Sequence, residues 1–470
     1  MHKSIRNCLF PAQRFLRRRG CARGVQLAML ILAISGGCAT AGAQVPSAPV
    51  RIPRHLTLAE AENLLLQRNL AIAVNRQQLE ASEAAKLIAS YKPNPTIQLG
   101  AEQYPVYSPL EGSVPRFVTT NSDAGAQPTY TFLFSKVIER GGKREYRTKQ
   151  AEAQVGAAKA QVRDIYRQQL LQLRQAYGGA ILARMNLDLA RQTLREYERT
   201  EKLTETRVQA GDAPQVERYR VRAGKLPYQQ AVLQAESAYR QACLDILNLL
   251  NSQRQDVVIQ PVPPGAKEES SGAVLDITGD FPDRAPLLLL DELKRIALEE
   301  RPDIEIARRT REAGQFGARL AEAQRKHDIS VGTEYQRVGS DSAVGVIASF
   351  PLFLYNNQKA GIAQARALER AGDFQLRQAE MQTITDVEKA WEQYQAAQQS
   401  LKVFSAENLE QTQKLRDVAF FSYQQGAISL FELLDAQRTL LQARTGYNQA
   451  RFDLQNSLWM LEAAIGRSLF

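Results

Sequence analysis

The chain has 470 residues, of which 44% are hydrophobic, 7% aromatic and 23% charged, with a mean hydropathy of -0.35. These values exclude a disordered polyelectrolyte and a protein made of many membrane-spanning helices. The formal net charge of +10 suggests nucleic-acid binding, but residues 1–43 carry seven basic residues and no acidic one. The rest of the chain has 53 basic and 50 acidic residues, so we expect no nucleic-acid partner.

Residues 1–43 have the organisation of a secretory signal peptide, with an arginine-rich start, an apolar stretch from Val25 to Ile34 and small residues after it. Cleavage after Ala43 fits the small-x-small rule for such peptides. Lipidation of Cys38 is the alternative, although Ser35 stands three residues before it, where leucine is usual. A disordered basic tail would leave the apolar stretch unexplained.

Four long segments contain almost no helix breaker and are rich in Ala, Gln, Leu, Arg and Glu, which predicts helices. They cover residues 145–210, 214–251, 358–425 and 430–464. At 1.5 Å per residue the longest would reach about 100 Å, so these helices must pack lengthwise. The last segment carries a heptad seam: Leu433, Leu440, Tyr447, Leu454 and Leu461, with Ala436, Ala443, Ala450, Ser457 and Ala464 three positions behind them. This pattern predicts left-handed, coiled-coil-like packing, which a spectrin-like rod would satisfy equally.

The sequence consists of two similar halves. An offset of 234 residues places 70–73 on 304–307, whereas an offset of 215 places Gly211 on Gly426. The first half therefore holds about twenty extra residues, in a Pro-, Ser- and Gly-rich stretch between Tyr104 and Pro128 that predicts an exposed loop. We expect an extended segment at 44–56, repeat 1 at 57–251, a linker at 252–286, repeat 2 at 287–466 and a C-terminal tail at 467–470.

In each half, two segments of alternating apolar and polar residues interrupt the helices. These predicted strands lie at about 96–104, 128–136, 329–337 and 343–350. Because the helices use their apolar seams on one another, an apolar strand face suits lipid. Four strands cannot enclose a lumen, and lipid tolerates no open sheet edge, so several copies must complete a barrel. Three copies would supply twelve strands, and two or four also satisfy the arithmetic.

Together these features resemble the TolC-like outer-membrane efflux family over residues 56–466, most closely its cobalt-zinc-cadmium (CzcC-like) branch. The junctions FSKVIERGGKR at 134–144 and FPLFLYNNQ at 350–358 carry the resemblance, although Lys136 stands where the branch usually has proline. The resemblance implies a mainly α fold with a small β part, in two tandem repeats of long helical hairpins with two strands each. It also implies a trimeric 12-stranded transmembrane β-barrel continued by a periplasmic α-helical barrel.

The two sharp reversals between long helices contain Gly211 and Gly426, and glycine permits the positive φ that such turns need. In the family these are the periplasmic tips, which contact an adaptor and form the closed entrance. The resemblance implies adaptor contacts at Arg207, Gly211, Gly426 and Ser429, and a periplasmic gate of Tyr423, Glu432, Asp435 and Glu217. Ile428 replaces an arginine of the family pattern.

The spacing of Glu432 and Asp435 puts both carboxylates on one helix face. Copies related by symmetry would then stack acidic rings, which favour cations in channels. Solvated charges beside a turn are the structural alternative for these residues and for Glu217.

No residues are expected to be catalytic, to bind a cofactor or to hold a metal. The three histidines have no Cys or His partner nearby, and no glycine-flanked serine nucleophile is present. The resemblance implies a passive exit duct for heavy-metal or other cations in outer-membrane lipid. Its partners would be two further copies of the chain, a periplasmic membrane-fusion adaptor and a proton-driven inner-membrane pump of the RND type. The alternatives are drug or protein export, a non-pore periplasmic coiled-coil adaptor, and a secreted enzyme decorated with helices.

Overall fold

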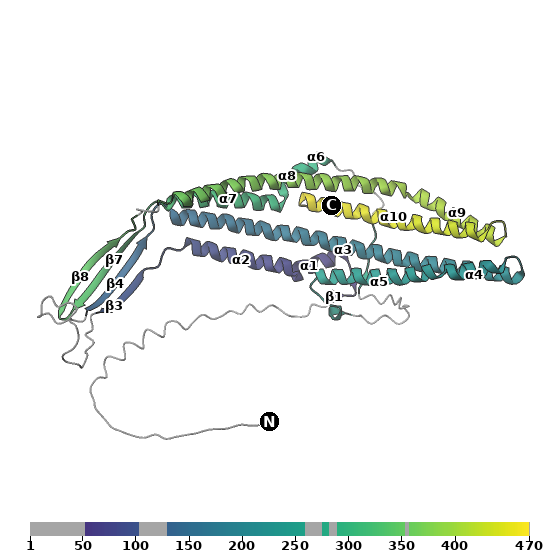
Figure 1. Cartoon of the computed structure of the whole chain (residues 1–470), viewed down its shortest axis with the longest axis horizontal. Coiled ribbons are helices and arrows are strands. Elements are labelled where there is room, and N and C mark those ends of the chain that lie inside the picture. The colour runs from purple at the N-terminus through teal and green to yellow at the C-terminus, as the bar shows by residue number, and fades with distance from the viewer. Residues whose placement is uncertain (1–51, 103–128, 259–274, 282–288, 353–356, 470) are drawn as a thin grey trace, which may run out of the picture. The chain divides into compact units, whose positions relative to one another are not determined.

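The computed structural model describes residues 52–102, 129–258, 275–281, 289–352 and 357–469. The expected signal peptide at 1–43, with Cys38, and the loop expected between Tyr104 and Pro128 lie outside these residues. Within them the chain is mainly helical (Figure 1).

The helices are α1 Leu58–Arg68, α2 Leu70–Ser90, α3 Lys143–Ala210, α4 Gln215–Gly224, α5 Leu226–Leu249, α6 Leu290–Glu300, α7 Pro302–Ala323, α8 Lys359–Val403, α9 Ala406–Gln424 and α10 Leu430–Ile465, with a 3₁₀ turn at Arg254–Asp256. The strands are β1 Ile52–Pro53, β2 His55–Leu56, β3 Thr96–Glu102, β4 Thr129–Ile138, β5 Val257–Val258, β6 Asp276–Ile277, β7 Ile329–Val338 and β8 Asp341–Ser349.

The two repeats follow the same order of elements, helix pair, strand pair and long hairpin, but their hairpins break on opposite sides. In the first repeat α3 runs unbroken for 68 residues, and the returning chain breaks between α4 and α5. In the second repeat the outgoing chain breaks between α8 and α9, and α10 returns unbroken. The expectation of continuous helices over 214–251 and 358–425 was therefore wrong.

Local chemistry explains both breaks. Pro227 lies in the first turn of α5, where its missing N–H cannot continue the hydrogen bonding of α4. At the second break, the Ser405 hydroxyl accepts a hydrogen bond from the Asn408 N–H at 3.3 Å and starts α9 as a new helix. The composition of both segments, which are rich in strong helix formers, does not indicate either break.

The heptad seam of α10 is the buried side of that helix. Its ten positions are buried except Ala443 and Tyr447, which are half-buried. Helix α10 contacts α3, α8 and α9, and α3 also packs against α2, α5 and α7 (Figure 1). The helices thus bury their apolar seams against one another, as the period of the sequence predicts. Among the described residues, none of the helices combines the length and the apolar character needed to cross a membrane.

Short parallel strand pairs attach the extended segment and the linker to the helices. β1 pairs with β5 and β2 pairs with β6, so residues before the first repeat lie against residues that follow it. The Tyr177 hydroxyl of α3 lies within hydrogen-bonding distance of the carbonyls of Leu56 and Thr278. A buried cluster that includes Ile52, Ile277 and Tyr177 makes this the largest core of the described chain.

The four longer strands form one antiparallel sheet in the order β3-β4-β7-β8. Its register aligns Leu99, Phe132, Tyr335 and Val344 in one row across the sheet, and Gly100, Thr131, Gln336 and Ala343 in the next. Because successive residues point to opposite faces, one face carries most of the large apolar side chains, including all the aromatic ones, and the other carries mainly small and polar ones. Within one chain the sheet is open, with β3 and β8 at its edges.

Candidate functional site

The two sharp turns between long helices have the same backbone geometry. Gly211 and Gly426 adopt φ values of 84° and 77°, in the left-handed region. After each glycine the next N–H bonds back across the turn, from Asp212 to the Arg207 carbonyl at 2.8 Å and from Ala427 to the Ser422 carbonyl at 2.9 Å. Both helices therefore end in a glycine cap that closes the chain reversal in very few residues.

Arg207 connects the two turns. Its guanidinium donates to the Tyr423 carbonyl at 2.8 Å and lies 4.6 Å from the centre of the Tyr423 ring. It also donates to the Asp212 carbonyl at 3.3 Å. A Cβ on Gly426 would only touch this guanidinium, at 3.4 Å, so the cost of a larger residue there is the strain of the positive φ. The structure thus brings together three residues that the sequence proposes for the tips, Arg207, Gly426 and Tyr423.

Tyr423 sits at the centre of a polar contact between the repeats. Its side chain is 1% exposed, and its hydroxyl donates to the Glu217 carboxylate at 3.1 Å. The Thr204 hydroxyl lies 3.0 Å from the Tyr423 hydroxyl and 2.9 Å from the Thr200 carbonyl, so its single proton has two acceptors within reach. Burial raises the pKa of Tyr423, and the charge of Glu217 raises it further. The tyrosine therefore stays a neutral donor between α3 and α4 of one repeat and α9 of the other.

Glu432 is the counterpart of Glu217 in the second repeat, but it makes a different contact. Its carboxylate accepts from the Ser429 N–H at 3.1 Å, and the Ser429 hydroxyl accepts from the Glu432 N–H at 3.4 Å. This capping box starts α10. The equivalent of Ser429 in the first repeat is Pro214, which offers neither a hydroxyl nor an N–H. Without a cap to engage it, Glu217 reaches Tyr423 instead.

Asp435 lies one turn further along α10 and pairs with Arg438 at 3.2 Å. The side chains of Glu432 and Asp435 are both exposed on the same helix. Ile428, which replaces the family arginine, packs against a buried cluster that contains Tyr423. The four residues expected to form the gate therefore divide within one chain into a contact between buried Tyr423 and half-buried Glu217, and an exposed acidic pair.

Sequence reasoning missed Thr204 and Pro214. Thr204 continues a buried polar stripe on α3, four residues after Thr200, which accepts from the Gln437 amide at 2.9 Å. A repeat of small polar residues at helical spacing was the available signal for this stripe. The offset of 215 residues already placed Pro214 on Ser429, so the difference between the two turns was present in the sequence.

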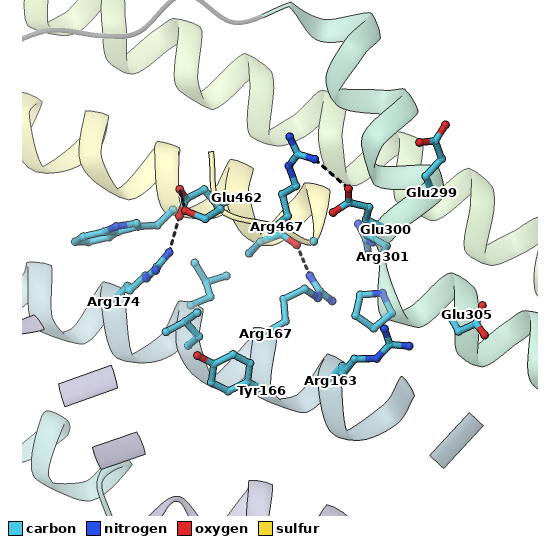
Figure 2. Close-up of a pocket in the computed structure, with 17 residues that line it drawn as sticks. Arg163, Tyr166, Arg167, Arg174, Glu299, Glu300, Arg301, Glu305, Glu462 and Arg467 are labelled. Atoms are coloured by element: carbon cyan, nitrogen blue, oxygen red, sulfur yellow. Dashed lines mark hydrogen bonds and ion pairs between the residues drawn. The ribbon is translucent and has the colours of Figure 1, made fainter. Parts of the chain in front are cut away.

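A cavity of about 710 Å³ lies where α3, the start of α7 and the end of α10 meet (Figure 2). Charged side chains line it, and most of them pair with one another or with neighbours. Arg174 binds Glu462, and Arg467 binds Glu300 at 3.0 Å. These matched charges stabilise the end of α10, and they leave little net charge to attract a ligand.

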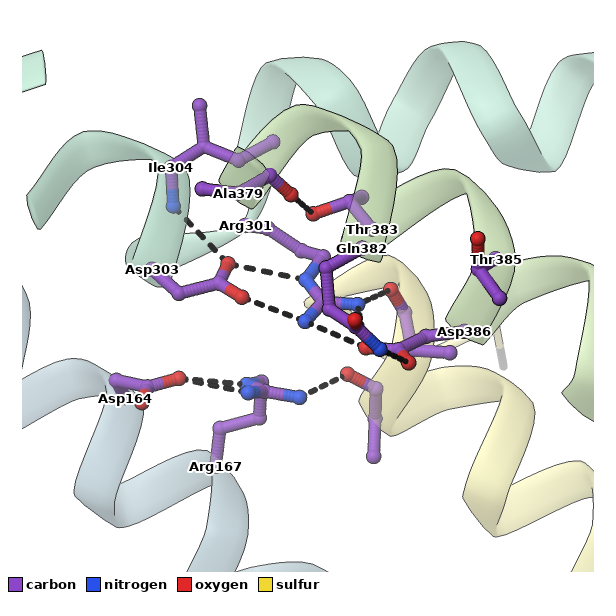
Figure 3. Close-up of polar contacts among 12 residues, drawn as sticks. Asp164, Arg167, Arg301, Asp303, Ile304, Ala379, Gln382, Thr383, Thr385 and Asp386 are labelled. Carbon is purple, nitrogen blue, oxygen red and sulfur yellow. Dashed lines mark hydrogen bonds and ion pairs between the residues drawn. The ribbon is translucent and has the colours of Figure 1, made fainter. Parts of the chain in front are cut away.

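A buried polar network lies beside this cavity (Figure 3). The Arg301 side chain, 4% exposed, binds Asp303 and reaches Asp386 on α8 at 3.1 Å and the Ala464 carbonyl at 3.2 Å. Burial alone would raise the pKa of Asp303, but the Arg301 hydrogen bonds and charge hold it below its usual range. Arg167 of the first repeat binds the neighbouring Ala463 carbonyl. Arginines from both repeats therefore cap the C-terminal end of α10.

These two repeats of long helical hairpins, joined by one sheet, define a protein of the TolC-like fold. A model of the outer membrane efflux protein family matches residues 62–252 and 293–467, one segment in each repeat. The chain belongs to the outer membrane efflux protein family. Its place is therefore the cell outer membrane, from which it extends into the periplasm, and its family is one of efflux proteins and not of enzymes.

Solved structures with the same fold include three outer-membrane proteins. The outer-membrane channel OprN is 20% identical, with 87% of this chain and 89% of that chain covered and a TM-score of 0.70. CusC is 17% identical, covers 87% and 92%, and has a TM-score of 0.68. VceC from Vibrio cholerae is 16% identical, covers 88% and 97%, and has a TM-score of 0.68. A comparison with proteins of curated function finds no match.

Proposed function

We propose that this protein is the passive exit duct of a tripartite efflux system. In this proposal three copies of the chain join their sheets into a 12-stranded transmembrane β-barrel, which continues as a periplasmic α-helical barrel. Residues 1–43 would direct export, with cleavage after Ala43 or lipidation of Cys38. The observation that carries the proposal is the four-stranded sheet, which exposes a large apolar face and ends in two unpaired edges.

The sheet supports membrane insertion in two ways. The row Leu99, Phe132, Tyr335 and Val344 is exposed across all four strands, as are Ile97, Phe134 and Val346 beside it. Such a face would be unstable in water and suits the outside of a barrel. The edges β3 and β8 need partners in lipid, because an unpaired backbone group there costs several kcal/mol. Identical neighbours can supply those partners, and three copies of the chain in all would give twelve strands, while two or four copies would also give an even number.

The turns support contact with a partner. Exposed apolar side chains cluster near them: Val216, Tyr219, Phe421 and Phe431. We assign adaptor contact to this end of the hairpins, including Arg207, Gly211, Gly426 and Ser429, and gating to Tyr423, Glu217, Glu432 and Asp435. As the family resemblance implies, an inner-membrane proton-driven pump of the RND type would energise export through the adaptor.

The junction motifs at 134–144 and 350–358 favour the CzcC-like branch, and with it heavy-metal or other cations as cargo. Exposed carboxylates of Glu432 and Asp435, repeated by symmetry, would attract such cations at the entrance. Drug or protein export is the alternative. Loss of the gene should sensitise cells to cobalt, zinc or cadmium salts under the first assignment, and only to organic toxicants or to loss of a secreted protein under the second.

Planar-bilayer recording tests the duct itself. The purified protein should form an oligomer of three chains and conduct ions, and multivalent cations should block the current. Replacing Glu432 with Gln and Asp435 with Asn should weaken that block, and an unchanged block would remove both residues from the entrance. A monomer that is extracted without detergent and does not conduct would contradict the proposal and favour the coiled-coil scaffold.

A further inference from the structure

A smaller cavity of about 430 Å³ lies at the junction between β4 and α3. Its charged lining consists of four basic and two acidic residues: Lys92, Lys136, Lys143, Arg144, Glu139 and Glu145. They come from three separate parts of the chain, namely the segment after α2, the end of β4 and the first turn of α3. The fold therefore gathers positive charge at the place where the sheet meets the helices.

Both acidic residues of this cavity are already paired with cations that do not line it. Arg147 binds Glu139 at 2.9 Å, and it also donates to the Ala89 carbonyl at the end of α2. Lys149 binds Glu145 at 2.7 Å, one turn further along α3. Neither carboxylate is left to neutralise the basic residues of the lining.

Of the four basic residues, only one has an acidic partner. Lys143 binds Asp328, the residue just before β7, at 2.8 Å. Lys92, Lys136 and Arg144 form no ion pair with any described residue. The larger cavity beside α10 differs in this respect, because most of its arginines are paired. The smaller cavity thus combines an excess of positive charge with room for a small polyatomic anion.

Lys136 also links the cavity to the apolar face of the sheet. On β4 it follows Phe132 and Phe134 at the two-residue period of that face, and only Ile138 comes after it on this face before the strand ends. A lysine at the end of a lipid-facing strand extends its ammonium toward the headgroups. The resembled branch usually has a proline at this position, so this cation distinguishes the present chain.

We propose that the cavity binds a phosphate group, and that this group is the headgroup of an anionic phospholipid in the inner leaflet of the outer membrane. The inference rests on the proposed insertion of the sheet in lipid. Lys92, Lys136 and Arg144 would bind the phosphate oxygens, and the acyl chains would lie along Phe132 and Phe134. Bound lipid would then fix the height of the sheet-to-helix junction relative to the membrane.

Native mass spectrometry of the detergent-purified oligomer tests the proposal with three probes: phosphatidylglycerol, phosphatidylcholine and inorganic phosphate. We expect the oligomer to retain phosphatidylglycerol in preference to phosphatidylcholine. Replacing Lys92, Lys136 and Arg144 with Gln should reduce retention by about fivefold for each cation removed. The variant with Arg199, Lys389 and Lys402 replaced by Gln loses the same charge at exposed helix positions, and it should retain lipid like the wild type.

Equal retention of phosphatidylglycerol by the two triple variants would overturn the site. Retention of inorganic phosphate without retention of phosphatidylglycerol, or equal retention of the two lipids, would overturn the assignment to an anionic lipid. If the triple cavity variant does not assemble, the single variants Lys136→Gln and Lys136→Arg are tested instead. Retention of phosphatidylglycerol should fall in Lys136→Gln and stay near the wild-type level in Lys136→Arg. Conductance separates the two proposals, since a conducting wild type without bound phosphatidylglycerol refutes only the lipid site.

Discussion

Glu217 and Glu432 occupy equivalent positions, six residues after the glycines of their turns, yet their carboxylates bind different groups. Glu217 accepts from the Tyr423 hydroxyl of the other repeat at 3.1 Å, whereas Glu432 accepts from the Ser429 N–H of its own helix at 3.1 Å. The difference follows from the residue three positions earlier, which is proline in one turn and serine in the other. Two similar turns therefore yield one contact between the repeats and one helix cap.

The first prediction concerns Pro214→Ser. The serine restores a hydroxyl and an N–H, so a capping box should form and withdraw Glu217 from Tyr423. The new cap should stabilise α4 by about 0.5–2 kcal/mol, while the repeats lose their contact at the turn. In planar bilayers we expect a higher basal conductance, similar to that of Tyr423→Phe. The double variant Pro214→Ser/Tyr423→Phe should conduct little more than either single variant. Fully additive increases in basal conductance would show that the two changes act on separate contacts.

Periodicity made much of the helical fold predictable, because buried residues such as Leu433 and Leu454 repeat over five heptads. The sheet was predictable for the same reason, since its apolar face alternates along each strand. The contact between Tyr423 and Glu217 was not, because 206 residues separate them and only the packing of α3 on α9 and α10 brings them together. The breaks before Leu226 and Ala406 depend on single residues, and the overall composition of a long segment does not reveal them.

A second prediction concerns Arg301, which ties the start of α7 to α8 and α10. Arg301→Ala would leave Asp303 and Asp386 without their cation and the end of α10 without a cap. We expect a loss of about 3–5 kcal/mol in unfolding free energy, measured by thermal or denaturant unfolding of the detergent-purified protein. Arg301→Lys keeps the charge but not the forked geometry, so it should lose less.

Arg467→Ala is the matched control for Arg301. Its ion pair with Glu300 at 3.0 Å lies among exposed side chains, so the change should cost only about 0–1 kcal/mol. Similar losses for Arg301→Ala and Arg467→Ala would mean that burial adds nothing to the network of Arg301.

A third prediction compares two neighbours on β4 that point to opposite faces of the sheet. Phe132 belongs to the apolar row, and Thr131 to the row of small and polar residues. If the apolar face contacts lipid, Phe132→Arg should destabilise the folded oligomer by about 2–4 kcal/mol near the middle of the bilayer. Thr131→Arg should be tolerated there, because in the proposed barrel it would face the water-filled side. Refolding into liposomes followed by urea titration measures both, and equal losses would argue against a lipid-facing row.

The fourth prediction concerns stability at alkaline pH, and it depends on the contact between Tyr239 and the linker residues Leu275 and Ile277. Tyr239 on α5 is 3% exposed; its hydroxyl donates to the Leu275 carbonyl at 3.2 Å and accepts from the Ile277 N–H at 3.2 Å. Burial raises the pKa of Tyr239 from 10.0 to about 12. The folded state therefore favours the neutral tyrosine. Its contribution is complete below pH 10, and it is lost as the pH rises toward 12, because the unfolded chain releases its proton first.

Melting temperatures measured between pH 9 and pH 12 test whether stability falls with rising pH in this way. Tyr239→Phe should lower stability at pH 9 by about 1–3 kcal/mol, because the Ile277 N–H loses its acceptor. The same variant should lose less stability on going to pH 12 than the wild type, since it no longer has this group to ionise. Tyr219→Phe, at a side chain that is 67% exposed, should keep the wild-type alkaline loss. If Tyr239→Phe loses as much stability between pH 9 and pH 12 as the wild type, other groups dominate the alkaline unfolding. Tyr197 is one such group, because burial raises its pKa to about 12.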